Sequence, residues 1–186
     1  MWEVMSPDNW KIGQNNIFRK ADRGFDAAFA QQVLTEGKHE VTFTILDSPL
    51  GCVCQYLGVC DAAHVHKYKQ RSSNPNVEEE TVAWAFAGSN GYLWVFRSPH
   101  EEYSSGVRKH LMPKTQNLAH ADKAKRATVK LVVDMETRRL AFQVNKEPMI
   151  DADVELPATG VRPFILLSQK DTIGLKVKRV ESAPAA

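Results

Sequence analysis

The residues best suited to binding a metal fall in one short stretch of the chain. Thiol, imidazole and carboxylate side chains lie there within fifteen positions: Cys52, Cys54, Cys60, Asp61, His64 and His66. Thiolates and imidazoles are the ligands that zinc takes. The cysteines, however, share parity on one predicted strand, where they would act as small buried apolar groups. We therefore expect no metal and no cofactor, and keep zinc as the alternative that metal analysis of the purified protein would test.

Acidic residues could instead serve hydrolytic chemistry, and they gather in two runs, Glu78 to Glu80 and Glu101 to Glu102. A glycosidase needs two carboxyl groups that face each other across roughly 5 to 10 Å. These runs lie in predicted loops and do not alternate along a strand that lines a groove. The sequence also has no Gly-x-Ser-x-Gly elbow and no glycine-rich phosphate loop. We therefore expect no enzyme and no small-molecule substrate.

Two long connections favour recognition of another polypeptide. They cover residues 61–80 and 97–105 and are rich in aromatic, basic and acidic side chains. Tyrosine and arginine combine contact area with hydrogen bonding and are enriched where binding energy concentrates. For any single residue, a plain solvated loop position is the competing interpretation, but the group favours a protein partner. The predicted partner-binding residues are His66, Tyr68, Arg71, Arg97, His100, Glu101 and Tyr103.

The charge balance gives little support to nucleic-acid or membrane binding. The chain carries 24 basic and 22 acidic side chains, a formal net charge of +2. The basic tracts Lys67 to Arg71 and Lys123 to Arg126 could contact phosphates, but two short runs in a nearly neutral protein are typical of solvated faces. We expect no nucleic acid and no membrane partner, and a salt-titrated binding assay would test the first expectation.

Alternating hydrophobicity places these residues in an all-β framework. Runs with a period of two predict strands, and no stretch shows a long helical stripe. Many short strands separated by turns indicate a β-sandwich of two antiparallel sheets. The predicted strands are Trp10 to Ile12, Ile17 to Lys20, Ala27 to Leu34, His39 to Leu46, Cys52 to Cys60, Thr81 to Ala87, Tyr92 to Phe96, Ala127 to Val133, Leu140 to Val144, Val161 to Leu167 and Thr172 to Val180.

Residues 127–145 form the clearest hairpin of the sequence. If the turn is centred on Glu136 and Thr137, the apolar residues of the two strands meet on one face. In this register the core-facing residues of one strand lie opposite the core-facing residues of the other. The predicted pairs are Val133 with Leu140, Leu131 with Phe142 and Val129 with Val144.

A second hairpin is predicted around Asn90 and Gly91. With a two-residue turn, Ala87 lies opposite Trp94 and Ala85 opposite Phe96. Both faces of this hairpin are apolar, which predicts a central position in a sheet that is covered on both sides. Either the N-terminal segment of the chain or a protein partner could supply one cover.

Strand alternation also places the two long connections. Successive strands of an antiparallel sandwich run in opposite directions, so alternate connections fall at the same end. Counting from the His39 strand, the connections 61–80 and 97–105 lie together at one end of the sandwich. Long connections without secondary structure of their own are uncommon unless they function or are disordered.

Seven short motifs follow one another along the chain: Gly37 to Val41, Leu57 to Cys60, Ala83 to Phe86, Gly91 to Trp94, Val133-Asp134, Leu140 to Asn145 and Val161 to Phe164. Their order and spacing resemble those of the SPRY domain, the core of the B30.2 module. The resemblance covers about residues 37–180 and implies a bent sandwich of two antiparallel sheets, in a family whose members bind other proteins through loops at one end without catalysis. The chain departs from the family at Asn145-Lys146, where Asn-Gly is usual, so we expect a different or longer turn there.

Length and termini complete the prediction. At 186 residues the chain suits one domain. We expect N-terminal strands wrapping the sandwich (1–36), a SPRY-like core (37–180) and a disordered tail (181–186). An odd number of cysteines and an N-terminus without a signal segment predict a cytoplasmic protein, for which a cytoskeletal or ciliary assembly is one setting. The sequence thus predicts a non-catalytic interaction module, a small subunit or adaptor of a larger assembly. A lectin-like carbohydrate-binding domain is the alternative.

Overall fold

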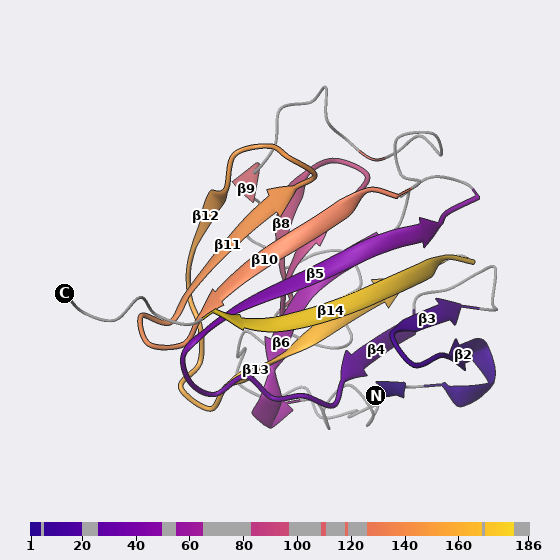
Figure 1. Ribbon diagram of the computed structural model, residues 1–186, viewed down its shortest axis with the longest axis horizontal. Coiled ribbons are helices and arrows are strands. Elements are labelled where there is room, and N and C mark those ends of the chain that lie inside the picture. The colour runs from indigo at the N-terminus through magenta and orange to yellow at the C-terminus, as the bar shows by residue number, and fades with distance from the viewer. Residues whose placement is uncertain are drawn as a thin grey trace, which may run out of the picture.

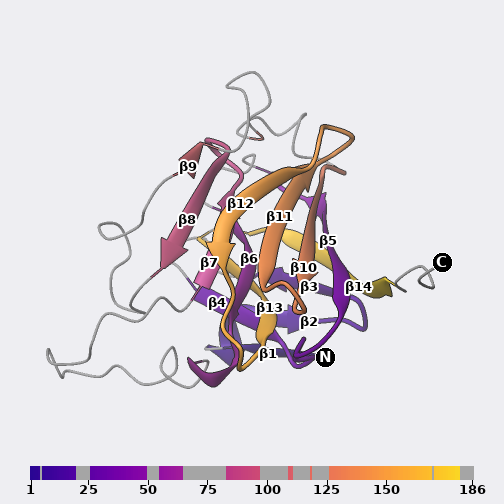
Figure 2. The same cartoon turned by 90° about the vertical axis from the view of Figure 1, so that its left-hand side faces the viewer.

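Two antiparallel sheets stacked face to face form the protein, as Figures 1 and 2 show from two directions. The computed structural model describes residues 1–4, 6–19, 26–49, 55–64, 83–96, 109–110, 118, 126–168 and 170–180. Within these residues there is no α-helix, only the short 3-10 turns Pro7–Asn9 and Ala62–His64. No helix in this described part of the chain is long and apolar enough to cross a membrane. The predicted all-β sandwich of two antiparallel sheets is confirmed.

Each sheet has seven strands. The first, called sheet A, has the order β1 (Trp2–Val4), β4 (Asp26–Ala30), β13 (Val161–Leu167), β6 (Gln55–Asp61), β7 (Ala83–Ala87), β8 (Tyr92–Phe96) and β9 (Lys109–His110). The second, called sheet B, has the order β12 (Ile150–Glu155), β11 (Arg139–Val144), β10 (Thr128–Asp134), β5 (Lys38–Asp47), β14 (Thr172–Val180), β3 (Asn16–Arg19) and β2 (Trp10–Ile12).

Most predicted strands are present, and three were not predicted. Strands β8, β13 and β14 have the predicted bounds. Strands β1 and β9 are three and two residues long, too short to show a period. Strand β12 reads Ile-Asp-Ala-Asp-Val-Glu, and aspartate is depleted in strands because it competes for backbone hydrogen bonds. Length and composition therefore explain the three omissions.

The inner faces of the two sheets enclose the main core. In sheet B, β10 and β11 alternate buried and partly exposed residues, as the period of two predicts. Their register has Val133 opposite Leu140, Leu131 opposite Phe142 and Val129 opposite Val144, so the predicted pairing is confirmed. The turn after β11 spans residues 145–149, as the departure from Asn-Gly predicted.

The register of the β7–β8 hairpin differs from the prediction. Ala85 lies opposite Trp94 and Ala83 opposite Phe96, a shift of two residues, so the predicted pairs were wrong. The loop is longer than two residues, because the N–H of Gly91 donates to the carbonyl of Ala87 (2.9 Å) and Gly91 adopts a φ of 72°. An even shift preserves parity, so small residues still face large ones.

The outer face of sheet A carries a second buried apolar cluster. It includes Phe29, Phe164, Tyr56 and Trp94, and the last two rings meet edge to face at 5.5 Å. All five residues of β7 are buried, which confirms the prediction of a strand covered on both faces. The described N-terminal strands are members of the two sheets and do not lie over this face. Since the cluster is buried within the chain itself, no partner is needed to cover it.

A buried ion cluster joins the sheets at their N-terminal edges. Arg19 of β3 is 1% exposed, its guanidinium lies 5.9 Å from the Trp10 ring, and it experiences the charges of Asp26 of β4 and Asp171. Burial lowers the pKa of Arg19, and the two carboxylates oppose that shift. Asp26 also accepts a hydrogen bond from Asn9 (2.9 Å). These contacts connect β3 of sheet B to β4 of sheet A.

Candidate functional site

One end of sheet A is where both long connections begin. Cys60 of β6 lies opposite Ala83 of β7, and Ala83 lies opposite Phe96 of β8. The chain therefore leaves β6, enters β7 and leaves β8 at the same end, which is called the β6–β8 end below. This agrees with the topology expected from strand alternation. The predicted partner-binding residues lie outside the described residues: His66, Tyr68, Arg71, Arg97, His100, Glu101 and Tyr103.

Asp61 fixes the chain where it leaves β6. This residue is 5% exposed, and its Oδ1 accepts hydrogen bonds from the Ala63 N–H (2.9 Å) and the Thr159 hydroxyl (3.0 Å). The Ala62 N–H donates to the carbonyl of Gly160 (3.0 Å). Gly160 has a φ of +95°, and a Cβ there would lie 2.9 Å from the Leu34 oxygen, so the turn requires glycine. The first residues of one long connection are thus bonded to the turn before β13.

Cys60 is a structural thiol. It is fully buried and belongs to the outer apolar cluster of sheet A. Burial raises the pKa of this thiol to about 12, and the nearby Arg162 charge opposes that shift. For Cys60 the predicted role as a small buried apolar group is confirmed, whereas Cys52 and Cys54 lie outside the described residues. Within the described residues, no three His, Cys, Asp or Glu side chains gather as a metal site.

A groove opens between the two sheets on the side where the N-terminal strands lie, β1 in sheet A and β2 and β3 in sheet B. Its volume is about 570 Å³, within the range of small-ligand pockets. The buried Trp2 and Ala30 of sheet A and the partly buried Leu175 and Val177 of sheet B line it together with polar residues, which include Gln14 and Gln32. This cavity, called the edge groove below, was not predicted. Its lining comes from four separate segments of the chain, and only the pairing of the strands brings them together.

Strand β1 forms one side of the edge groove and is held by an arginine of β13. The guanidinium of Arg162 in β13 donates to the carbonyl of Ala30 (2.6 Å) and to the carboxylate of Glu3 (2.8 Å). Burial lowers the pKa of Arg162. The Arg162 guanidinium also lies 6.0 Å from the Phe29 ring. Because the arginine is 8% exposed, this pair is shielded from solvent on one side and holds the short β1 strand in place.

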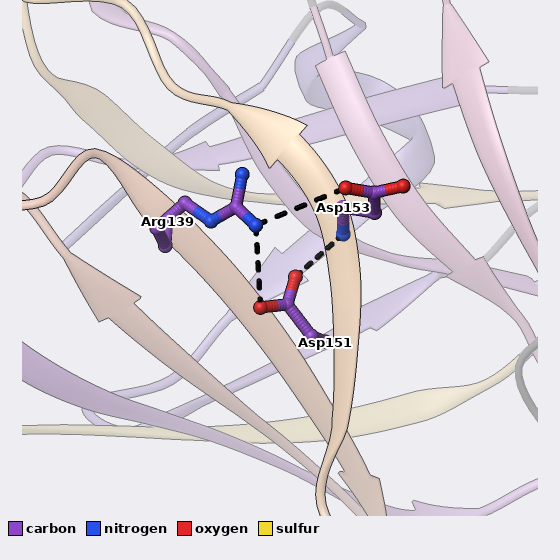
Figure 3. A network of polar contacts seen from close by, with 3 residues as sticks. All are labelled: Arg139, Asp151 and Asp153. Carbon is purple, nitrogen blue, oxygen red and sulfur yellow. Dashed lines mark hydrogen bonds and ion pairs between the residues drawn. The ribbon is translucent and has the colours of Figure 1, made fainter.

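The acidic edge of sheet B is neutralised within the chain. Figure 3 shows Arg139 of β11 reaching Asp151 (3.6 Å) and Asp153 (3.8 Å) of β12. The Asp153 N–H donates to the Asp151 carboxylate (2.6 Å), and Asp153 has a φ of +57° at a bulge in the register. Exposed ion pairs of this kind contribute about 0 to 1 kcal/mol. The charges and the bulge make β12 a poor template for another strand.

The fold is similar to that of known SPRY domains. The SPRY domain of human HERC1 superposes with a TM-score of 0.57 at 14% sequence identity, covering 93% of this chain and 96% of that chain. The chain has a SPRY-like fold. The TRIM65 PSpry domain gives a TM-score of 0.52 at 12% identity, with 94% of this chain and 90% of that chain covered.

The SPRY-like sandwich is also similar to a plant lectin. The metal-free lectin I-B4 of Griffonia simplicifolia gives a TM-score of 0.54 at 11% identity, covering 95% of this chain and 90% of that chain. No protein-family model and no curated protein matches the sequence. At these identities the likeness concerns the fold, and function must be argued from the residues of this chain.

Proposed function

We propose that this SPRY-like domain is a non-catalytic interaction module that binds a partner polypeptide through the β6–β8 end. The observation that carries the proposal is the register of Cys60, Ala83 and Phe96, which makes residues 62–82 and 97–108 leave the same end of sheet A. Loops gathered at one end of a rigid sandwich are a common way to build a binding surface. SPRY domains, which the chain resembles, bind proteins in this way.

The frame beneath this end suits such a role. The Asp61 bonds to Ala63 and Thr159 hold one connection at its root, and β6, β7 and β8 are rigid because both of their faces are buried. A fixed root lowers the entropy lost when a loop becomes ordered on a partner. We infer that Tyr68, Arg71, Arg97 and Tyr103 supply much of the contact energy, and that His66, His100 and Glu101 also contribute to partner binding.

In the cell, the module would act as a small subunit or adaptor. A domain without a catalytic step exerts its effect through the assembly that it joins, and a cytoplasmic complex, such as a cytoskeletal or ciliary one, would be its setting. This role follows from the proposed binding and shares its test.

Alanine variants of Tyr68, Arg71, Arg97 and Tyr103, combined in one protein, test the proposal. Affinity purification from the native source, followed by quantitative mass spectrometry, measures the occupancy of each co-purifying polypeptide. Loss of hot-spot contacts should weaken partner binding by about 2 kcal/mol or more, which raises the dissociation constant roughly thirtyfold. Matched controls are alanine variants of two exposed residues at the opposite end, Asp47, the last residue of β5, and Lys146, in the turn after β11. Full occupancy of every partner by a folded loop variant would reject the proposal.

Carbohydrate binding is the second candidate, favoured by the similarity to the Griffonia simplicifolia lectin. A glycan array separates the two candidates, because a lectin-like domain binds defined glycans without any polypeptide. Saturable glycan binding that is lost in the same loop variant would replace the peptide proposal with this one.

A further inference from the structure

Strand β14 has an open backbone edge beside the edge groove. On one side β14 pairs with β5 along its whole length, from Thr172 to Val180. On the other side β3 pairs only with residues 172–174, and the Leu175 N–H makes a last bond to the Asn15 carbonyl (2.9 Å). Figure 1 shows β3 alongside only the first part of β14. No described strand pairs with β14 on this side beyond that point.

The free edge offers regularly spaced hydrogen-bonding groups. Residues of an antiparallel strand turn their N–H and C=O groups alternately to the two sides. Because the Leu175 N–H points toward β3, the backbone groups of Val177 and Arg179 point to the same, open side. Among the described residues, no group accepts a hydrogen bond from either of these two N–H groups. Another strand could therefore pair here in line with β3.

Side chains around this edge define what such a strand must carry. Leu175 and Val177 point inward and are only partly buried, so both present apolar atoms to the groove, beside the buried Trp2. Lys176 and Lys178 point outward and are exposed. A strand that pairs with β14 directs alternate side chains into the groove and toward solvent. Apolar residues suit the first set of positions, and acidic residues suit the second.

We propose that the edge groove binds an extended polypeptide in which apolar and acidic residues alternate, and that this segment adds to β14 as an extra strand. Main-chain hydrogen bonds to Val177 and Arg179 supply affinity, and contacts with the apolar side chains of β14 and with its lysines supply selectivity. The edge of β12 is unsuited to the same role, because its bulge and its charges disrupt strand pairing.

The occupant is a different chain and not a second copy. Two β14 edges that pair with each other would set basic strands side by side, with the lysines of one copy near those of the other, and like charges opposite one another destabilise a strand pair. The site lies apart from the β6–β8 end and does not depend on the function proposed for that end.

A synthetic peptide of sequence Asp-Val-Glu-Val-Asp-Val-Glu, blocked at both ends, is the probe. Its binding to the full chain is measured by fluorescence anisotropy, and its position by amide chemical shifts and hydrogen exchange. We expect the amides of Leu175 to Arg179 to shift and those of Val177 and Arg179 to become protected. The matched peptide with lysine at each acidic position should bind about tenfold more weakly.

Two variants test the mode of binding. Val177→Pro removes an N–H that points away from β5, so the strand ladder survives while peptide affinity should fall by about tenfold or more. If that variant does not fold, Lys176→Glu combined with Lys178→Glu should weaken the acidic peptide by about tenfold, whereas Lys146→Glu, at a distant exposed position, should not. Alanine variants of Tyr68 and Arg97 should leave this binding unchanged, which separates it from binding at the β6–β8 end.

Three results would overturn the proposal. The first is an absence of peptide binding, or shifts that fall outside β14 and the groove. The second is peptide affinity that is unchanged in a folded Val177→Pro protein, or in the double lysine variant. The third is a dimer, measured by light scattering and lost on Val177→Pro, which would assign the edge to a second copy of the chain.

Discussion

The two sheets have inner faces of the same kind but very different outer faces. On sheet A the outer face is apolar and buried, with Phe29 and Phe164 rings 5.6 Å apart. On sheet B the outer face is polar and partly exposed, and cross-strand pairs such as Lys130 and Glu40 (3.8 Å) lie on it. Sheet A is thus buried on its outer face as well as its inner one, whereas the outer face of sheet B is solvated.

This difference separates two ways of binding. The central strands β6 and β7 of sheet A are buried on both faces, so they can contribute only their ends, where residues 62–82 and 97–108 depart. Sheet B keeps its outer face and part of one strand edge in solvent, so it can contribute backbone hydrogen bonds. The difference predicts that equivalent substitutions on the two outer faces have unequal effects.

The two outer faces should differ most in the unfolding free energy lost when a large side chain is removed. Phe164→Ala on sheet A leaves a cavity in a fully buried cluster and should cost about 3 to 5 kcal/mol of unfolding free energy. Val132→Ala on sheet B removes partly exposed atoms and should cost about 1 kcal/mol or less. Urea denaturation measures both values, and similar costs would show that the two faces are equivalent.

Thiol reactivity tests the same comparison without changing stability. Because burial raises the pKa of Cys60 to about 12, its thiolate is scarce at neutral pH. In a Cys52→Ser, Cys54→Ser protein, Cys60 should react with a disulfide reagent about a thousandfold more slowly than a cysteine introduced by Thr42→Cys on the outer face of sheet B. Comparable rates in the folded state would mean that the outer face of sheet A is open.

Glycine substitutions sharpen the comparison at the backbone level. A Cβ on Gly58 of β6 would lie 1.9 Å from the Trp84 oxygen, so Gly58→Ala must displace β7 and should cost about 3 kcal/mol. A Cβ on Gly174 of β14 would lie 3.5 Å from Leu46, an ordinary contact, so Gly174→Ala should be neutral or stabilising by about 0.5 kcal/mol. Thermal unfolding measures the stability of both variants. A Gly58→Ala protein as stable as the wild type would contradict the close approach of β6 and β7.

The smallest expected effect is electrostatic and belongs to sheet B. Burial alone would raise the pKa of Asp134, but hydrogen bonds from Thr137 and Glu136 and the Lys38 charge outweigh it, so the pKa lies below its ordinary value of 3.8. The ionised group therefore stabilises the folded state above about pH 4, and this contribution is lost as the pH falls through the lower folded-state pKa.

Asp134→Ala checks this contribution. The variant should cost about 1 kcal/mol at pH 7, and its deficit should shrink in acid, because the wild-type protein loses the same stabilisation there. Asp134→Asn keeps the oxygen that accepts the turn hydrogen bonds and serves as the matched control. A deficit that does not change between pH 7 and pH 3 would argue against an ionic role.

The contrast between the sheets was partly readable in the sequence. Strands that alternate, such as β10 and β11, predicted a one-sided sheet and a correct register, because each shift by one residue would expose the core. The run Ala-Trp-Ala-Phe-Ala of β7 predicted burial on both faces. Its register with β8 was wrong by two residues, because the length of the turn depends on the Gly91 to Ala87 hydrogen bond and not on the apolar pattern.

The binding surfaces were less accessible to sequence reasoning. Strand direction alone predicted that the two long connections begin at one end, and the register agrees. The edge groove could not be predicted, because it exists only where the short β1 and β3 strands stop and leave Leu175 and Val177 partly uncovered. The inward direction of these two side chains follows from alternation, but their exposure depends on long-range strand pairing.

Crosslinking of the natively purified complex with a lysine-reactive reagent tests the central claim, that a partner polypeptide sits on the β6–β8 end, most directly. We predict crosslinks to the partner from Lys67 and Lys69, which lie in the connection after β6, and none from the exposed Lys146 at the opposite end. Crosslinks that concentrate at Lys146, with Lys67 and Lys69 unmodified by any partner, would contradict the account.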